Sequence, residues 1–596
     1  MTTEESPTRP ALILLVLLML SGLLFFLGLG SMGLTDRDEG RNAEAGREMY
    51  ASGDLLTPTF NEELRVAKPV FLYWLMTASY HLFGVNEFAA RFPSALFGVG
   101  LILMQYLFLS RLRGHAVALF ASLMLLLNVE MLALGRMALT DSVLIFFTTS
   151  SLYGFWLGLH GAGRTRHWMW WFYAGMALAT LTKGPVGVAV PLVTVMLYLT
   201  ASRRWTAYWQ QGFPIAGLLL LLALALPWYA AMLVVHGDAY TTQAKVHTVG
   251  RFLSPMEGHG GTVWFYLPVV LLGFFPWSGL LPAALYRAFR SWRETRHIAK
   301  RVEANGSADL PRITDPASRP DDHLEWFAAL WVVGVFLFFT LSSTRLPHYI
   351  GPLFPAAAML TALYWSDGLK NPLTTGLRGS IHGMMALGYL VALAFASVPT
   401  LYEKFSGKML REFPLATQFD LGSGPYLAAA VILIGTVLVG YFGLNDERRG
   451  AAFWAAGGML AGLILIVIVT VIPGLNRYAI APPQELAYAA GQNLGPKDQL
   501  IAYGSTRPST VFYARRKTVF IPSGEEERLR ATLMHPGKTM ILLPETMRDR
   551  LPVEAKAFQP ILKRHGYLLL ASQPMVTIPE GVVPPADHQA PRIFGH

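Results

Sequence analysis

Apolar runs of membrane-spanning length recur along most of this chain. The first covers residues 11–30 without a single charged residue, and about 20 helical residues are enough to cross the hydrocarbon core of a bilayer. Of the 596 residues, 53% are apolar and only 14% are charged, whereas an average soluble domain has about 25% charged residues. We therefore expect a polytopic α-helical membrane protein, and a large soluble enzyme is excluded.

The apolar runs predict about 13 transmembrane helices. The expected spans are residues 11–33, 88–110, 116–134, 139–160, 168–182, 184–201, 212–235, 263–286, 325–342, 349–366, 379–399, 425–444 and 451–473. Because this number is odd, the two ends of the chain are expected on opposite sides of the membrane.

Positive charges in the connecting segments indicate the orientation, since short cytoplasmic loops are enriched in Lys and Arg. If the N-terminus is cytoplasmic, every inside loop carries at least two cations. These are Arg111 and Arg113, Arg164 and Arg166, Arg203 and Arg204, the group from Arg287 to Arg301, Lys370 and Arg378, and Arg448 and Arg449. The segment after the first span and everything after residue 473 then lie outside.

Two domains are expected. Residues 1–474 form the transmembrane domain, with an outer loop at 34–87 that carries juxtamembrane helices and a polar inner linker at 289–323. Residues 475–596 form a small outer α/β domain. Its expected strands are 500–503, 539–543 and 567–570, and a polar helix is expected around 525–534.

Several classes of protein are excluded or disfavoured by absent features. There is no cysteine, so disulfides, a thiolate nucleophile and a cysteine-bound metal are impossible. There is no Walker motif and no GxGxxG sequence opening a helix after a strand, which disfavours an ATP-driven pump and a nicotinamide enzyme. The net charge is +10, but the cations are dispersed, so no nucleic-acid partner is expected.

The outer loop after the first span carries an unusual concentration of charge. Asp38 and Glu39 begin a sequence that fits a short helix ending at Gly53, and its sparse apolar positions indicate a location at the membrane interface. Farther along, Lys68 precedes an aromatic-rich segment that includes Tyr73. A lysine at this depth suits an anionic lipid headgroup, with an ordinary interfacial anchor as the alternative.

Other outer segments carry more ionisable residues. Asp141 stands at the outer start of a span, where it suits a shared polar site but also simple helix capping. The remaining candidates are Lys183, Arg251, His259, Arg345, His348 and Tyr349. Lys68, Lys183, Arg251 and Arg345 place four cations on the face that the charge rule leaves poor in them. Such cations indicate a bound phosphate or pyrophosphate, with a nearby acid available as a general base.

These motifs, in this order, resemble the aminoarabinose (lipid A) transferase branch of the GT-C glycosyltransferases, which is related to the protein O-mannosyltransferases. The resemblance covers residues 11 to about 355. It rests on the Asp38–Glu39 pair, on Lys-Pro with aromatics at 68–74, on RxxxTD at 136–141, on KGP at 183–185, on Arg251-Phe, His259 and Pro-Trp-Ser at 276–278, and on Arg-Leu-Pro-His-Tyr at 345–349.

The resemblance implies a GT-C fold in a bacterial inner membrane, with a cytoplasmic N-terminus and a periplasmic C-terminal domain. It implies transfer of a sugar, such as 4-amino-4-deoxy-L-arabinose, from undecaprenyl phosphate or another polyprenyl phosphate. The acceptor would be lipid A or another envelope glycolipid or protein, and the transfer would invert the anomeric centre.

The same resemblance assigns roles to the candidate residues. Asp38 would be the base or the acid that orients the substrate, with Asp141 and Glu39 as further acids of the catalytic pocket. The substrate and its phosphate would be bound by Lys68, Lys183, Arg251, His259, Arg345, His348, Tyr349 and Tyr73. No cofactor is implied with certainty. A divalent metal stays open, although Ala67 stands where the family often has a glutamate ligand.

Two alternatives are weighed against this hypothesis. One is an enzyme closer to the protein O-mannosyltransferases. The other is a transporter or flippase of lipid-linked substrates, which predicts acids in the middle of spans and broken helices in paired halves. The chain shows no internal repeat, and its candidate charges gather at one face, so the enzyme is favoured.

Overall fold

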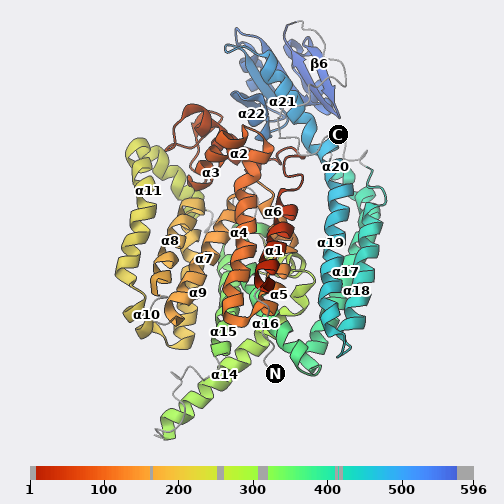
Figure 1. The fold of residues 1–596 in the computed structure, drawn as a ribbon. Helices are drawn as coiled ribbons and strands as arrows, with labels where there is room; N and C mark the ends of the chain where they lie inside the picture. The colour runs from red at the N-terminus through yellow and green to blue at the C-terminus, as the bar shows by residue number, and fades with distance from the viewer. Residues whose placement is uncertain are drawn as a thin grey trace.

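The computed structural model describes residues 8–161, 166–250, 261–305, 320–409, 414 and 420–573. A bundle of helices fills most of the molecule, and a smaller domain with a β-sheet stands at one end of the bundle (Figure 1). The bundle helices are α1 (Thr8–Phe26), α4 (Glu87–Arg113), α5 (His115–Leu126), α6 (Val129–Gly135), α7 (Thr140–His160), α8 (Trp168–Lys183), α9 (Val186–Ser202), α10 (Trp205–Gln211), α11 (Pro214–Lys245), α13 (Tyr266–Gly273), α14 (Leu281–Asn305), α15 (Pro320–Leu341), α16 (Phe354–Lys370), α17 (Thr375–Met409), α18 (Gly424–Gly443) and α19 (Arg449–Ile466).

The chain is a multi-pass membrane protein, and each of the 13 expected spans overlaps a helix of the bundle. Within the described ranges, seven helices are long and apolar enough to cross a membrane, or nine if the bent pairs α5–α6 and α13–α14 each form one span. The expected number of 13 is therefore not confirmed. The difference arises from short helices, since α8 has 16 residues and α16 has 17, below the length of about 20 that a perpendicular span requires.

The outer loop folds into α2 (Asp38–Ser52), a two-stranded ribbon of β1 (Thr59–Phe60) and β2 (Glu63–Leu64), and α3 (Phe71–Phe83). The expected helix stop is confirmed: Gly53 has a left-handed φ of 73°, and its N–H donates to the Met49 carbonyl at 3.0 Å. Glycine adopts this conformation without the steric penalty of a Cβ atom.

The expectation that α2 lies outside a packed core is wrong, because the helix is packed between α3 and α22 (Ser509–Ala514) of the C-terminal domain and buries more than half of its residues. Two glycines make this close packing possible. A Cβ atom on Gly40 would lie 2.7 Å from the backbone nitrogen of Ser509, and one on Gly46 would lie 2.9 Å from the Cβ of Met76. The sparse apolar residues of α2 are thus compensated by small residues that let its backbone approach both neighbours.

The C-terminal domain contains a five-stranded mixed sheet in the order β4-β3-β5-β7-β6. Its strands are β3 (Gln499–Tyr503), β4 (Thr518–Ile521), β5 (Thr539–Pro544), β6 (Gln559–Arg564) and β7 (Tyr567–Ala571), and its helices include α21 (Ala481–Asn493), α23 (Glu526–Leu533) and α24 (Val553–Lys556). Strand β3 pairs in parallel with β4 and β5, while β7 runs antiparallel to β5 and β6. The three expected strands and the polar helix are present, and β4 and β6 are additional.

The first part of the expected polar linker at 289–323 is helical. Helix α14 continues through it to Asn305 and projects from the end of the bundle opposite the C-terminal domain (Figure 1). Residues 291–305 contain no Pro or Gly and are rich in Arg, Glu, Ala and Lys, which are strong helix formers. The rest of the expected linker, residues 306–319, lies outside the described residues.

Candidate active site

A cavity of about 400 Å³ opens beside α2, at the end of the bundle that carries the C-terminal domain. Its wall contains Asp38, the first residue of α2, together with residues of α6 and of the segment that leads into α16. The lining residues are Asp36, Arg37, Asp38, Glu39, Arg41, Glu130, Ala133, Leu134, Met137, Leu139, Thr344, Leu346, Pro347, His348 and Tyr349. Four expected site residues, Asp38, Glu39, His348 and Tyr349, therefore line one cavity.

Asp141 and Lys183 form an ion pair next to this cavity. Asp141 lies in the first turn of α7 and Lys183 is the last residue of α8, and these two helices pack against each other. The Lys183 Nζ lies 2.6 Å from Asp141 Oδ1, and both side chains are buried. The Lys183 ammonium also lies over the Tyr349 ring, 4.6 Å from its centroid. Helix dipoles favour an acid at the first turn and a cation at the last, so each charge suits its position.

His348 connects the cavity with this ion pair. It lines the cavity, and it lies within electrostatic reach of Asp141, Lys183, Lys68 and Asp38. Burial lowers the pKa of His348; the two lysines act in the same direction and the two carboxylates oppose them. The imidazole is therefore neutral at pH 7. Two acids and two cations that are distant in the sequence are thus within electrostatic reach of one histidine.

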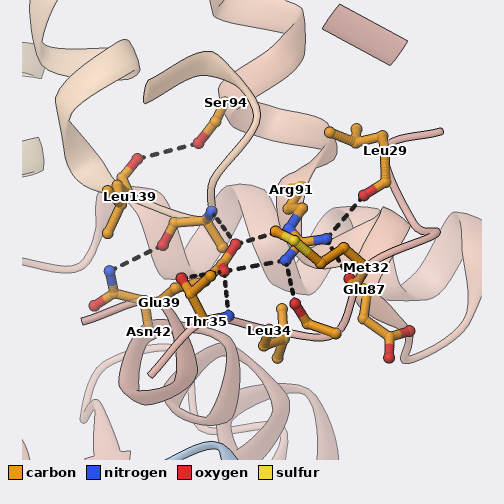
Figure 2. Close-up of polar contacts among 12 residues, drawn as sticks. Leu29, Met32, Leu34, Thr35, Glu39, Asn42, Glu87, Arg91, Ser94 and Leu139 are labelled. Carbon is orange, nitrogen blue, oxygen red and sulfur yellow. Dashed lines mark hydrogen bonds and ion pairs between the residues drawn. The ribbon is translucent and has the colours of Figure 1, made fainter. Parts of the chain in front are cut away.

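Glu39 is buried in a dense polar network that Figure 2 shows. Arg91 of α4 donates to both of its carboxylate oxygens, with Nε 2.7 Å from Oε1, and the backbone nitrogen of Ala138 donates to Oε1 at 2.9 Å. Both the N–H and the hydroxyl of Thr35 donate to Oε2. Burial alone would raise the pKa of Glu39, but Arg91 and these hydrogen bonds outweigh burial and hold the pKa below its usual value.

Arg91 ties Glu39 to the chain that leaves the first helix. Its guanidinium also donates to the carbonyls of Leu29, Met32 and Gly33 at 2.6–2.9 Å, as Figure 2 shows in part. A buried arginine with five acceptors is fully satisfied and holds its surroundings in one arrangement. This network fixes the backbone on which Asp38 stands.

Lys68 and Tyr73 are both buried. Arg65 Nε donates to the Tyr73 hydroxyl at 2.9 Å, and another guanidinium nitrogen of Arg65 donates to Asn42 Oδ1 at 3.0 Å. Burial raises the pKa of Tyr73, so its hydroxyl stays protonated. Tyr73 thereby connects α3 to α2, close to Asp38.

Three of the expected phosphate-binding residues are not among those that the structure describes at the cavity. Arg345 donates to the carbonyls of Gly261 and Thr340 and is not among the residues that line the cavity. Arg251 and His259 lie outside the described residues.

Two charged residues of this region, Glu130 and Arg91, are not among those expected from the sequence. Glu130 lines the cavity, and its Oε1 is buried without a hydrogen-bond partner. Each is a charged residue within or beside an expected apolar span, and ionisable residues in such positions are generally functional or paired. In the described ranges no cluster of three His, Asp or Glu side chains is arranged to hold a metal ion.

Comparisons with known proteins identify the family to which the chain belongs. The family model described as dolichyl-phosphate-mannose-protein mannosyltransferase matches residues 15–241. The undecaprenyl phosphate-alpha-4-amino-4-deoxy-L-arabinose arabinosyl transferase of Edwardsiella ictaluri (strain 93-146) is 30% identical over 438 residues, which cover 72% of this chain and 71% of the relative. The protein of the same description from Enterobacter sp. (strain 638) is 30% identical over 472 residues, 78% of each chain. The chain belongs to this arabinosyl transferase family.

Solved structures support the same fold. The crystal structure of ArnT from Cupriavidus metallidurans bound to undecaprenyl phosphate has a TM-score of 0.72 at 22% identity, and the match covers 96% of this chain and 100% of the other. An oligosaccharyltransferase from Archaeoglobus fulgidus in the apo form has a TM-score of 0.50 at 13% identity, covering 91% of this chain and 70% of the other. This member of the arabinosyl transferase family therefore has the GT-C fold.

Proposed function

We propose that this protein transfers a sugar from a polyprenyl phosphate, with undecaprenyl phosphate as the carrier and 4-amino-4-deoxy-L-arabinose as the sugar. The observation that carries the proposal is the grouping of Asp38, Lys68, Asp141 and Lys183 around His348. Membership of the arabinosyl transferase family supports the choice of carrier and sugar. The proposed acceptor is lipid A or another envelope glycolipid or protein.

The two lysines would neutralise the leaving phosphate. As the bond between the anomeric carbon and the phosphate oxygen breaks, the electron pair passes to the phosphate, and fixed cations in a site shielded from water stabilise that charge. Asp141 holds Lys183 in place at 2.6 Å. A hydroxyl acceptor, attacking from the opposite face of the sugar, would lose its proton to Asp38. A phosphate acceptor is already ionised, and Asp38 would then orient it.

Glu39 has a different proposed role. Its oxygens are occupied by Arg91, Thr35 and Ala138, so we assign it to holding the first turn of α2 and leave proton transfer to Asp38. Tyr73, His348 and Tyr349 would shape the walls around the donor. Arg345 would brace the segment before His348, and Arg251 and His259 remain proposed phosphate ligands from the sequence alone.

The cavity also suits an amino sugar. Glu130 is one of the residues that line the cavity, and its buried Oε1 has no hydrogen-bond partner. A buried carboxylate is stabilised by a cation that hydrogen-bonds to it. The ammonium group of an aminoarabinose would supply that cation. A neutral sugar could offer Glu130 only a hydroxyl hydrogen bond and no counter-charge, which distinguishes the proposal from mannosyl transfer.

We further propose that the protein lies in a bacterial inner membrane with a cytoplasmic N-terminus. Residues 1–474 would be the catalytic domain and residues 475–596 the periplasmic domain. The short inner loops carry paired cations, and the positive-inside rule supports this orientation.

A reconstituted transfer assay tests the function. Purified protein in liposomes receives undecaprenyl phosphate carrying aminoarabinose, together with lipid A, and the product is measured by mass spectrometry. We expect Asp38→Asn and Lys68→Ala each to abolish transfer while the protein still folds. Lys370→Ala, an exposed lysine at the end of α16 away from the cavity, is the control and should behave as the parent protein. Full activity in both site variants would refute the site.

The protein O-mannosyltransferase-like alternative has its own support in the mannosyltransferase family model that matches residues 15–241. It predicts that a polyprenyl phosphate carrying mannose, offered with a protein acceptor, is used at least as well as the aminoarabinose donor. Running both donors in the same liposomes decides between the two.

A further inference from the structure

We propose that the C-terminal domain positions the catalytic acid, with Arg507 as the positioning residue. The Arg507 guanidinium lies 3.3 Å from Asp36 Oδ2, and the backbone nitrogen of Ser509 donates to Asp36 Oδ1 at 3.0 Å. Asp36 is two residues before Asp38. This inference rests on the proposed function, because it assigns Asp38 a role in the transfer.

The contact at Asp36 is one of several that hold the same short segment. The backbone nitrogen of Gly33 donates to the Asn476 side chain at 3.0 Å, and the nitrogen of Leu34 donates to the Tyr513 hydroxyl at 3.0 Å. The Gln484 side chain donates to the Leu34 carbonyl at 2.5 Å. Residues 33–36 are thus held through both backbone and side chain by residues 476–513. We call residues 33–36, together with the residues that hold them (Asn476, Gln484, Arg507, Ser509 and Tyr513), the clamp.

Arg507 is itself fixed within its own domain. Its guanidinium donates to the Ala479 carbonyl at 2.8 Å and to the Tyr567 hydroxyl at 3.0 Å. Its side chain is about nine-tenths buried, and that of Asp36 is four-fifths buried. A guanidinium with these anchors offers Asp36 a fixed direction, which a flexible surface cation cannot do.

The chain that follows residues 33–36 is held by a second anchor, the ion pair between Glu39 and Arg91 of α4. Between the two anchors stands Arg37, with φ 71° and ψ −100°. A non-glycine residue adopts a positive φ of this kind only where the surroundings impose it, and such strain gathers at functional sites. The anchors at Asp36 and Glu39, on either side of Arg37, can impose this positive φ.

Asp38 follows this strained turn directly and starts α2. The first bonds of the helix come from the held segment, since Gly40 donates to the Thr35 carbonyl at 3.1 Å and Arg41 donates to the Arg37 carbonyl at 3.2 Å. A shift of Asp36 would therefore reach the first turn of α2 and move the Asp38 carboxylate. Displacements near 1 Å at a reacting group lower rates by about 100-fold.

Simple domain docking is the competing explanation, and the molecule offers a control for it. Lys517 and Glu62 also join the C-terminal domain to the outer loop, at 3.5 Å. Both side chains are more than half exposed, and Glu62 lies in the turn between β1 and β2, away from Asp38 in sequence. If the C-terminal domain acts only by docking, loss of the Asp36–Arg507 contact should lower the yield of folded protein and leave kcat per folded enzyme unchanged, while Lys517→Ala controls for removing an exposed cation between the same two parts of the chain.

The test compares Arg507→Ala, Asp36→Asn, the double variant and the control Lys517→Ala in the full chain. For each, kcat and the donor KM are measured per folded enzyme, and hydrogen–deuterium exchange is followed in the peptide that covers residues 33–41. We expect both single clamp variants to lower kcat by about 10–100-fold with little change in KM and with faster exchange in this peptide. The double variant should lose no more than Arg507→Ala, and Lys517→Ala should match the parent protein.

Three outcomes would overturn the inference: unchanged kcat and exchange in the clamp variants, a loss confined to the yield of folded protein, or an equal loss in Lys517→Ala. Asp36→Asn keeps an acceptor for Ser509 while removing the charge that Arg507 meets, so it tests the contact even if Arg507→Ala does not fold. If the parent protein transfers no sugar at all, the proposed function fails, and the exchange measurement still decides whether the clamp orders residues 33–41.

Discussion

Replacing Arg91 by methionine tests the buried network under Asp38. Methionine keeps much of the arginine's length and fills the space, but it removes the cation. Glu39 would then be a buried carboxylate without its counter-ion, and the carbonyls of Leu29, Met32 and Gly33 would lose their donor. The side chains of Arg91 and Glu39 are 2% and 0% exposed, so water cannot replace what is lost.

The expected cost is about 3–5 kcal/mol in the free energy of unfolding, because removing one partner leaves the other as an uncompensated buried charge. Glu39 keeps its three donors from Thr35 and Ala138, which places the value toward the lower end of that range. The double variant Arg91→Met with Glu39→Gln removes the charge as well. It should recover roughly 1–2 kcal/mol relative to Arg91→Met alone, since neutral groups cost less to bury than ions.

Unfolding in mixed detergent micelles, followed by tryptophan fluorescence, measures these differences. Arg528→Ala is the matched control, because its pair with Glu525 is exposed on both sides, and exposed pairs contribute about 0–1 kcal/mol. The reasoning fails if Arg91→Met costs less than about 1 kcal/mol, or if the double variant is less stable than Arg91→Met.

Three further predictions concern the cavity and its neighbours. Glu130→Gln should lower kcat/KM for an aminoarabinose donor by about 10–100-fold, the value of one charge-assisted hydrogen bond, and should leave kcat/KM for a neutral-sugar donor little changed. Competition between the two donors measures the two values, and equal losses for both donors would contradict the prediction. Lys183→Met should lower kcat about 100-fold or more by removing a fixed cation, as single-turnover kinetics with saturating donor would show; a loss confined to KM would contradict the role in phosphate departure. The pKa of His348 lies below its ordinary 6.5 in the folded protein, so below about pH 6.5 the unfolded chain binds a proton that the folded chain resists, and stability falls as the pH falls. His348→Gln should flatten this decline in stability in thermal melts between about pH 7 and 5. The charged groups that act on His348 are Asp38, Asp141, Lys68 and Lys183. An unaltered decline would show that it does not arise from His348.

Local sequence patterns predict the elements of this fold well. Apolar runs long enough to cross a bilayer locate the helices of the bundle, Gly53 correctly ends α2, and short continuous apolar segments locate β3, β5 and β7. These features depend on neighbours within a few residues. The burial of α2 could not be predicted in this way, because it depends on Ser509 and Met76, which approach Gly40 and Gly46 only in the folded molecule.

The same distinction applies to the candidate site. The expected spans place Asp38, Lys68, Asp141, Lys183 and His348 in outer segments. The structure brings the four charges within electrostatic reach of His348, because all five residues stand at the same end of the bundle. The expected spans could not identify the partner of Glu39, since Arg91 lies 52 residues away in the sequence and nothing local indicates the pair. The Asp36–Arg507 contact spans 471 residues, and only a three-dimensional structure reveals it.

That separation has a consequence for how the protein is made. Chains are synthesised at about 5–20 residues per second, so Asp36 is made roughly 25–95 seconds before Arg507, which lies 471 residues later. During that time residues 33–36 are without their ligands from the last domain. If Arg507 positions Asp38 as proposed, biogenesis would have a built-in order, because the newly made bundle would begin turnover only after residues 476–513 have folded against it.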